Sequence, residues 1–364
     1  MHGNNEKETF MKRTYLYDEH VKLGAKFTEF GGWEMPLYYT SIIDEHNAVR
    51  NGCGVFDTSH MGAFIIKGSG AAKFLDKVTL GNIAGLAEKK ARYSMILNEN
   101  GGIKDDIIVY NLGGEYMMVV NAGNLEKDWQ WLNCHKEENV ILENKSAGIS
   151  LLALQGPASE KILRGISETQ IADMKYFTCS QLRLKDISAG FCKIARTGYT
   201  GEDGFEIFIS RSQTKFLWDK LMELGVKPCG LGCRDTLRLE ACMPLHGHEI
   251  SEEINPIDAG FAKIIYWENS FIGKDKLLDI KNAPARKSVA FECLGAIARS
   301  GNKVYAGAEE AGYVTSGTFS PTLKKAIGMA LINFNINSDE LEIEIHNNRR
   351  KAVLTQKPFY KRKK

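Results

Sequence analysis

Two apolar runs separated by a short polar turn constrain the fold of this chain more than any other feature. Residues 93–97 (Tyr-Ser-Met-Ile-Leu) and 107–110 (Ile-Ile-Val-Tyr) are rich in the side chains that favour strands. Between them, Asn-Gly-Gly at 100–102 supplies the positive φ angles that a tight turn requires. The pattern predicts a hairpin whose returning strand begins at Asp105 and Asp106.

These two carboxylates are the first candidates for chemistry. Successive side chains of a strand point to opposite faces, so Asp105 and Asp106 are expected on different sides of the sheet. Asp106 shares its face with Ile108 and Tyr110, and a carboxylate with such neighbours can serve in acid–base chemistry because its pKa is easily shifted. The alternative is that both acids lie in solvent at the turn, since Asp is rarely buried.

A glycine-rich segment at 198–204 (Gly-Tyr-Thr-Gly-Glu-Asp-Gly) leads into a predicted strand. A dinucleotide fingerprint would lead into a helix, and a Walker loop would end in Gly-Lys-Ser/Thr, so the segment is neither. It predicts a tight bend that presents Tyr199 and then Glu206, which shares a strand face with Phe208. A carboxylate beside aromatic rings can accept two parallel hydrogen bonds from a flat, amino-substituted heterocycle. A glutamate on the surface is the alternative.

The distribution of helix and strand signals changes near 281–285 (Lys-Asn-Ala-Pro-Ala). Before this segment, helices and strands mix without regular βαβ alternation, which is typical of an α+β fold. After it, short strands with polar turns predict a small β-barrel or sandwich. We expect a polar extension at 1–10, an α+β region of two subdomains at 11–280, and a β-barrel domain at 285–364. Within the α+β region, Phe-Gly-Gly-Trp-Glu-Met-Pro at 30–36 is expected to be irregular.

Charge and cysteine usage restrict the partners and the compartment. The 364 residues include 47 Lys and Arg against 45 Asp and Glu, a net charge of +2, so no overall field favours nucleic acid or an anionic membrane. The apolar runs are shorter than a membrane span. The eight cysteines contain no Cys-x-x-Cys pair, and residues 1–10 are unlike an Arg-rich transit peptide. We expect reduced thiols and a cytoplasmic protein, or one of the mitochondrial matrix if the source is eukaryotic.

Two patterns resemble metal or thiol sites. His246 and His248 are one residue apart, but no further ligands stand at a standard spacing, so we expect a polar loop and no metal. Cys229 and Cys233 precede Arg234 at a predicted helix start, where a thiol can be reactive. Buried small hydrophobic side chains are the default interpretation of these cysteines.

Eight motifs taken together resemble one known family. They are Phe-Gly-Gly-Trp-Glu-Met-Pro (30–36), Phe-Asp-Thr-Ser-His-Met-Gly (56–62), Asn-Glu-Asn-Gly-Gly-Ile-Lys-Asp-Asp (98–106), Gln-Gly-Pro (155–157), Arg-Thr-Gly-Tyr-Thr-Gly-Glu-Asp-Gly-Phe-Glu (196–206), Gly-Leu-Gly-Cys-Arg-Asp (230–235), Ser-Gly-Thr-Phe-Ser-Pro-Thr (316–322) and Lys-Pro-Phe-Tyr (357–360). In this order they closely resemble the aminomethyltransferase, or T-protein, family of the glycine cleavage system. The resemblance covers residues 11–360.

The resemblance implies a three-domain, ring-like fold around a central cavity that binds tetrahydrofolate. It also implies an enzyme that takes an aminomethyl group from the dihydrolipoyl arm of its partner, the lipoylated H-protein. The carbon passes to tetrahydrofolate, giving 5,10-methylenetetrahydrofolate, and ammonia leaves. In this family pattern Asp106 is the catalytic residue, where its negative charge would favour an iminium-like cation. The folate contacts are five residues: Tyr93, Asn121, Tyr199, Glu206 and Arg234.

Some positions depart from the usual family pattern. Lys263 stands where many members carry an apolar or aromatic residue, and this departure concerns one wall of the pocket. His246 and His248 also replace more usual residues, and we expect both to be peripheral. The basic cluster at 361–364 is expected to be a solvated tail, with assistance to H-protein docking or to the glutamyl tail of folate as alternatives.

Two alternative functions share this fold or its pterin site. One is a tetrahydrofolate-dependent demethylase of a small methylated sulfur or nitrogen compound. The other is a folate-binding accessory protein of iron–sulfur maturation that is not a transferase, which carries a cysteine at the position of Gly198. The complete motifs at 100–106 and 198–204 favour the aminomethyltransferase over both.

Overall fold

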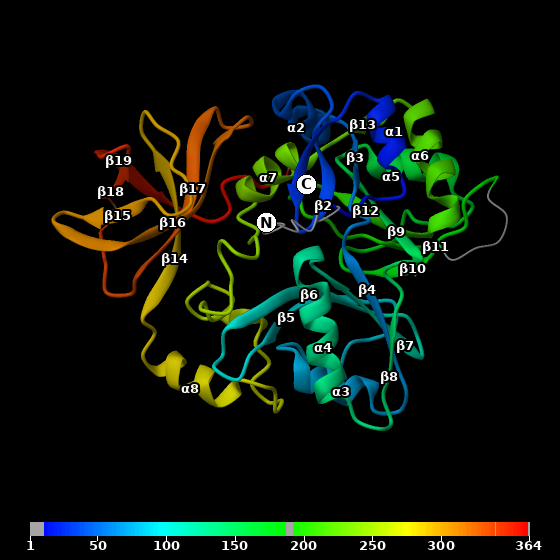
Figure 1. Ribbon diagram of the computed structural model, residues 1–364, viewed down its shortest axis with the longest axis horizontal. Helices are drawn as coiled ribbons and strands as arrows, with labels where there is room; N and C mark the ends of the chain where they lie inside the picture. Colours follow the sequence, from blue (N-terminus) through cyan, green and yellow to red (C-terminus); the bar gives the residue numbers. More distant parts are fainter. Residues whose placement is uncertain (1–10, 187–191, 339, 363–364) are drawn as a thin grey trace, which may run out of the picture.

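A computed structural model describes residues 11–186, 192–338 and 340–362. The predicted extension at 1–10 lies outside the described residues, as do Lys363 and Lys364. Two sheets with their helices and a separate barrel surround the centre of the molecule (Figure 1).

The first group is built on a six-stranded sheet of order β10-β11-β12-β9-β3-β13. Its strands are β3 (Gly54–Asp57), β9 (Ile149–Gln155), β10 (Cys179–Gln181), β11 (Cys192–Ala195), β12 (Gly204–Ser210) and β13 (Lys227–Pro228). The accompanying helices are α1 (Tyr17–Lys22), α5 (Ser159–Ile166), η2 (Arg211–Gln213) and α6 (Thr214–Glu223). Phe205, Ile207 and Ile209 of β12 pack in one core with α5 and α6. Glu206 and Phe208 therefore face the other side of the sheet, as the alternation predicts.

The second group is a five-stranded sheet of order β5-β6-β7-β4-β8 with helices on one face. Its elements are β4 (Gly62–Lys67), α3 (Ala71–Val78), β5 (Ala91–Leu97), β6 (Ile103–Asn111), β7 (Glu115–Val120), η1 (Ala122–Asn124), α4 (Leu125–His135) and β8 (Ile141–Asn144). The predicted hairpin is confirmed, because β5 and β6 pair antiparallel. Ile107 and Val109 of β6 pack with side chains of α3 and α4, so the alternate residues Asp106, Ile108 and Tyr110 face away from these helices.

The two sheets meet through an apolar layer. Tyr110 and Met117 of the five-stranded sheet pack with Leu151 and Phe208 of the six-stranded sheet. The rings of Tyr110 and Phe208 have centroids 5.4 Å apart in an edge-on arrangement. The face of β6 that carries Asp106 is thus turned toward the face of β12 that carries Glu206.

The segment at 30–36 is a regular hairpin, so the prediction of an irregular segment is wrong. Strands β1 (Lys26–Phe30) and β2 (Trp33–Tyr38) pair antiparallel across Gly31 and Gly32. Both glycines have positive φ, which is the conformation that a two-residue hairpin turn requires. Pro36 is tolerated because this sheet has only two strands, and each is an edge strand.

The C-terminal part is a closed six-stranded barrel of order β14-β17-β16-β15-β18-β19. Its strands are β14 (Arg286–Cys293), β15 (Lys303–Ala306), β16 (Glu309–Ser320), β17 (Lys325–Asn333), β18 (Glu340–Ile345) and β19 (Asn348–Thr355). Three helices of the preceding chain complete the fold: α2 (Ile42–Asn51), α7 (Leu231–Glu240) and α8 (Lys274–Asn282), with η3 (Ala262–Ile264) between the last two. The predicted α+β fold with a C-terminal barrel is confirmed.

Helix α7 contacts the barrel through a buried hydrogen bond. Arg238 is buried, and its guanidinium donates to Ser316 of β16 at 2.8 Å and to Glu249 at 2.8 Å. Because all barrel strands follow α8, we propose the domain division between 280 and 285. None of the helices in the described part of the chain has the length and hydropathy that a membrane span requires.

Candidate active site

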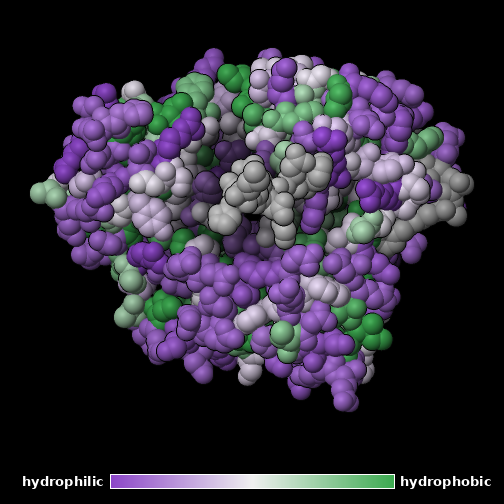
Figure 2. All heavy atoms as spheres, in the orientation of Figure 1, coloured by the Kyte–Doolittle hydropathy of each residue, from purple (hydrophilic) through white to green (hydrophobic). Residues whose placement is uncertain are grey.

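A cavity of about 420 Å³ lies between the two sheets and the loop at 242–246. All six predicted site residues line it, from five separate parts of the chain: Tyr93 (β5), Asp106 (β6), Asn121 (after β7), Tyr199 and Glu206 (before and on β12) and Arg234 (α7). This volume lies within the range of small-molecule sites. Figure 2 shows that this face of the molecule is hollowed near its centre.

Asp106 is held in the cavity wall by two donors. The Tyr93 hydroxyl donates to Asp106 Oδ2 at 3.1 Å, and Asn121 Nδ2 donates to Oδ1 at 2.8 Å. The side chain is open to the cavity but enclosed by protein elsewhere. Burial and the neighbouring charge of Asp105 raise the pKa of Asp106 to about 7, although both hydrogen bonds act in the opposite direction. This carboxyl group therefore changes its charge near neutral pH.

Asp105 is fully buried, so the alternative of two solvated acids at a turn is wrong. It accepts hydrogen bonds from the backbone N–H of Asn121 at 2.9 Å and from Asn124 Nδ2 at 2.5 Å. Asn121 Nδ2 also lies 2.9 Å from Asp105 Oδ1. The side-chain amide of Asn121 thus contacts both carboxylates, although Asp105 and Asp106 are successive residues of a strand.

Glu206 is buried in the opposite wall of the cavity. The Tyr110 hydroxyl donates to Glu206 Oε2 at 3.0 Å, and the Thr197 hydroxyl donates to the same oxygen at 2.5 Å. Since both of these donors reach Oε2, Oε1 can accept hydrogen bonds from a bound ligand. The arrangement fits the predicted recognition of a heterocycle that presents parallel N–H donors.

Tyr199 and Arg234 form a flat, cationic part of the wall. The guanidinium carbon of Arg234 lies 4.7 Å from the centroid of the Tyr199 ring, which is a cation–π contact. The Tyr199 hydroxyl donates to the backbone carbonyl of Pro244, and this bond fixes the ring. Burial lowers the pKa of Arg234 and raises that of Tyr199, but a guanidinium remains charged in proteins.

Several lining residues were not predicted from the sequence. His60 is buried next to Phe30, with ring centroids 5.7 Å apart, and its Nδ1 has no hydrogen-bond partner among the described residues. Burial and the charge of Arg234 lower the pKa of His60 to about 4, so the ring is neutral. The one sequence feature that could have identified His60 as a site residue is its place in the motif at 56–62. Tyr176 and Phe261 also line the cavity, and both lie in loops without periodic patterns.

The three residues that depart from the family pattern differ in their position relative to the cavity. His246 lines the cavity, so the expectation that it is peripheral is wrong. His248 lies at a backbone contact, with Nδ1 2.9 Å from the carbonyl oxygen of Thr315. Lys263 is exposed, and Phe261 contributes the wall at this point.

The basic tail is not simply solvated at Arg362. The guanidinium of Arg362 donates to Asp203 at 3.3 Å and lies 5.3 Å from the ring centroid of Tyr176, which lines the cavity. Lys361 is exposed, and Lys363 and Lys364 lie outside the described part of the chain.

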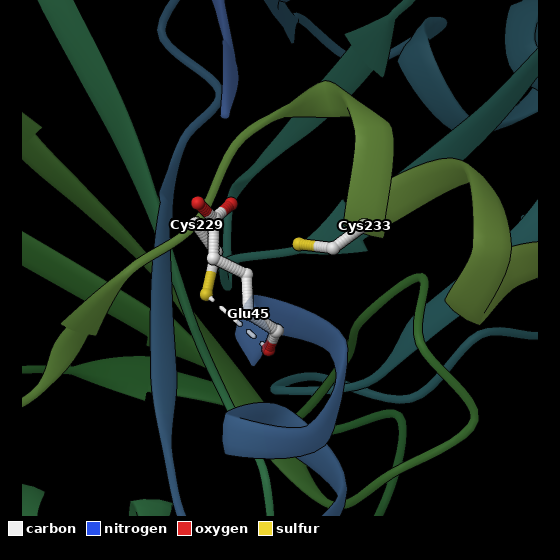
Figure 3. Close-up of side chains that lie close together, drawn as sticks. All are labelled: Glu45, Cys229 and Cys233. Atoms are coloured by element: carbon white, nitrogen blue, oxygen red, sulfur yellow. Dashed lines mark hydrogen bonds between the residues drawn. The ribbon is translucent and has the colours of Figure 1, made fainter. Parts of the chain in front are cut away.

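Three buried residues have side chains of the types that bind metals, but their possible ligand atoms already make hydrogen bonds to the backbone. Glu45 of α2 lies beside Cys229 and Cys233 (Figure 3). The Glu45 carboxylate accepts three backbone N–H groups, from Tyr39 at 2.6 Å, Thr40 at 3.0 Å and Gly230 at 2.9 Å. The thiols donate to backbone carbonyls, and burial raises the pKa of Cys233 well above its ordinary value. These contacts attach α2 to the start of α7.

Family profiles match nearly the whole chain. The profile described as the GCVT N-terminal domain matches residues 16–269, and the glycine cleavage T-protein C-terminal barrel domain matches residues 286–361. The chain therefore belongs to the glycine cleavage T-protein family. Both the α+β part that carries the cavity and the barrel that follows it are included in this assignment.

Individual relatives show the activity more narrowly. The chain is 45% identical to an aminomethyltransferase of Geobacillus sp. (strain WCH70), over 97% of this chain and 100% of the relative. It is 44% identical to an aminomethyltransferase of Thermotoga sp. (strain RQ2), over 96% and 98%. The crystal structure of the glycine cleavage system aminomethyltransferase T from Bartonella henselae is 31% identical, with a TM-score of 0.89 and coverage of 96% and 98%.

These similarities support a tetrahydrofolate-dependent one-carbon transferase of the glycine cleavage system. The activity is the transfer of the aminomethyl carbon to tetrahydrofolate with release of ammonia. Neither the demethylase nor the iron–sulfur accessory protein is favoured.

Proposed function

We propose that the cavity between the two sheets binds tetrahydrofolate with its pterin at Glu206, and that the lipoyl arm of the H-protein delivers the aminomethyl group beside Asp106. The observation that carries this proposal is a pair of carboxylates, one from β6 and one from β12, that line a single cavity. Most of the other lining residues are apolar or aromatic, among them Phe30, Ile108, Val119 and Phe261. Such a lining suits a flat ring with a few directed polar groups.

Glu206 and Tyr199 have binding roles in this proposal. Glu206 accepts the parallel donors of the pterin, and Tyr110 and Thr197 fix the orientation of its carboxylate through Oε2. Tyr199, held by Arg234 and by the carbonyl of Pro244, provides a surface for the ring. Both groups are set before ligand binding, which lowers the entropy cost of association.

Asp106 is the catalytic residue in this proposal. When ionised, it stabilises the positive charge that develops on the transferring carbon as ammonia leaves. A pKa near neutrality also suits it to accept the proton that a folate nitrogen releases on bonding to this carbon. Tyr93 and Asn121 direct the two oxygens of the carboxylate.

The remaining parts of the proposal concern the partner, metal and location. The lipoylated H-protein is the carrier, and tetrahydrofolate is the co-substrate. We expect no metal in the reaction, since both the charge stabilisation and the proton transfer are assigned to Asp106. A cytoplasmic location agrees with the eight cysteines, which are all free thiols.

The test is ammonia release from aminomethylated H-protein, measured with and without tetrahydrofolate. Wild-type enzyme should release ammonia rapidly only when folate is present. Asp106→Asn should lower kcat by roughly 10²-fold, the scale of an electrostatic contact to a transition state, with little change in folate affinity. Asp219→Asn, on the surface of α6, is the matched control and should behave as wild type. Unchanged turnover in Asp106→Asn would remove this residue from the mechanism.

A further inference from the structure

Asp128 is a buried carboxylic acid without a donor. It lies in the first turn of α4, its side chain is completely buried, and neither of its oxygens accepts a hydrogen bond from a donor among the described residues. An ionised carboxylate in such a place would lose its hydration without compensation, which is expensive. The position therefore strongly favours the protonated form, which can donate a hydrogen bond as well as accept one.

The acceptor for that proton is Asp105. The two side chains lie within hydrogen-bonding reach of each other, and Asp105 is also fully buried. Two carboxylates in a buried environment cannot both ionise cheaply, so the pair holds one proton. Burial and the charge of Asp105 raise the pKa of Asp128 to about 10.

The nearby cations are engaged elsewhere. Lys127 Nζ donates to the backbone carbonyl of Lys104 at 2.9 Å and to Glu252 at 2.9 Å. Lys104 Nζ donates to Glu252 at 3.4 Å. Their charges lower the pKa of Asp128, but this effect is smaller than those of burial and of Asp105. The charge of Asp105 also acts on His246, where it opposes the lowering of the imidazole pKa by burial.

Asp128 is linked to the reacting residue Asp106 through Asp105 and Asn121. Asp105 accepts from the backbone N–H and the side chain of Asn121, and also from Asn124. Asn121 Nδ2 in turn contacts Asp106 Oδ1 at 2.8 Å. Residues 121–128 form one short segment from the end of β7 into α4. The hydrogen bonds to Asp105 therefore hold this segment in place.

We propose that Asp128 stays protonated at neutral pH, donates a hydrogen bond to Asp105, and is a positioning residue that keeps Asn121 aligned with Asp106. The inference rests on the proposed role of Asp106 for its functional consequence. The Asp105–Asp128 pair carries one negative charge, and this arrangement leaves the oxygens of Asp105 free to hold the amide of Asn121. Asp128 itself does not line the cavity.

The proton is tested by ¹³C NMR of the full-length enzyme with carboxyl-labelled aspartate, titrated from pH 5 to pH 9. One aspartate resonance should remain that of a protonated acid above pH 8, and Asp128→Asn should remove it. If the resonance that Asp128→Asn removes titrates near the ordinary aspartate value, the inference is overturned. This readout does not depend on activity, so it separates failure of the inference from failure of the proposed role of Asp106.

The positioning role is tested by two substitutions of similar size. Asp128→Asn keeps a neutral donor toward Asp105, so its kcat should stay within about 3-fold of wild type. Asp128→Leu removes the donor, so kcat should fall by about 10-fold while KM for tetrahydrofolate stays constant. Equal losses in both variants would mean that an ionised carboxylate is needed, which would overturn the inference.

Thermal unfolding gives a second readout for the same pair of variants. The folded pKa of Asp128 is raised, so its contribution to stability is present below the unfolded pKa and is lost as pH rises toward about 10. Asp128→Asn removes this dependence, so the Tm of the variant minus the Tm of wild type should increase from pH 5 to pH 8. A gain that does not grow with pH would contradict a buried protonated acid.

Discussion

Replacing Glu206 with Gln should weaken folate binding without unfolding the protein. Tyr110 and Thr197 both donate to Oε2, and the amide oxygen of a glutamine can accept the same two hydrogen bonds. The amide nitrogen then occupies the place of Oε1, where it meets a donor of the pterin. Of the two hydrogen bonds from the pterin to the carboxylate, one is weakened because its acceptor is no longer charged. The other is lost, because the glutamine amide and the pterin N–H are both donors.

The size of this effect follows from the two contacts. A hydrogen bond to a charged group is worth about 1.5–3 kcal/mol, so weakening one and losing another should cost about 2–4 kcal/mol. Because about 1.4 kcal/mol is tenfold in affinity, the Kd for tetrahydrofolate should rise by roughly 30-fold to 700-fold. Isothermal titration calorimetry measures this change directly, and the Tm of the free protein should shift little.

Glu202→Gln is the matched control. Glu202 is also buried and lies on the same glycine-rich segment, but it pairs with Arg50 at 3.0 Å and does not line the cavity. This variant should lower the Tm because it removes a partner from a buried charge, and it should leave folate affinity unchanged. If Glu206→Gln binds folate as wild type does, or if both variants lose affinity equally, Glu206 does not hold the pterin.

Three further predictions concern the same site. The kcat should rise with pH through about 7 as Asp106 ionises, and a pH profile of Asp106→Asn should lack this acid limb. Asp105→Asn removes a charge that raises the pKa of Asp106, so the acid limb should move to lower pH; a limb that stays in place would exclude this coupling. Gly198→Ala would bring a Cβ within 2.0 Å of the buried Gln155 side chain, so urea unfolding should show a loss of about 1–3 kcal/mol, and an unchanged midpoint would contradict the packing.

The local patterns of the sequence predicted the elements that carry the two carboxylates. The hairpin of β5 and β6 follows from strand-forming runs around Asn-Gly-Gly, and the alternation along β12 places Glu206 opposite to Phe205 and Ile207. Such signals are local, and period and turn chemistry suffice to interpret them. The same reasoning gives a wrong prediction at Gly31-Gly32, because this glycine pair forms a regular hairpin turn between paired strands and not an irregular segment.

The remaining features depend on contacts that no local pattern records. His60, Tyr176 and Phe261 reach one cavity from three segments that are far apart in the sequence. Asp105 and Asp128 are 23 positions apart, and their pairing requires the packing of α4 against β6. Burial also decides the charge of these acids, and burial is a property of the folded chain rather than of the residue.

The most direct test of the account is a structure of the enzyme with bound tetrahydrofolate. We predict that the pterin donates to Oε1 and Oε2 of Glu206, or to Oε1 alone with Oε2 retained by Tyr110 and Thr197. The folate nitrogens that receive the carbon should lie beside Asp106, within reach of its carboxylate. A pterin bound outside this cavity, or bound in it with the reacting nitrogens turned away from Asp106, would contradict the account.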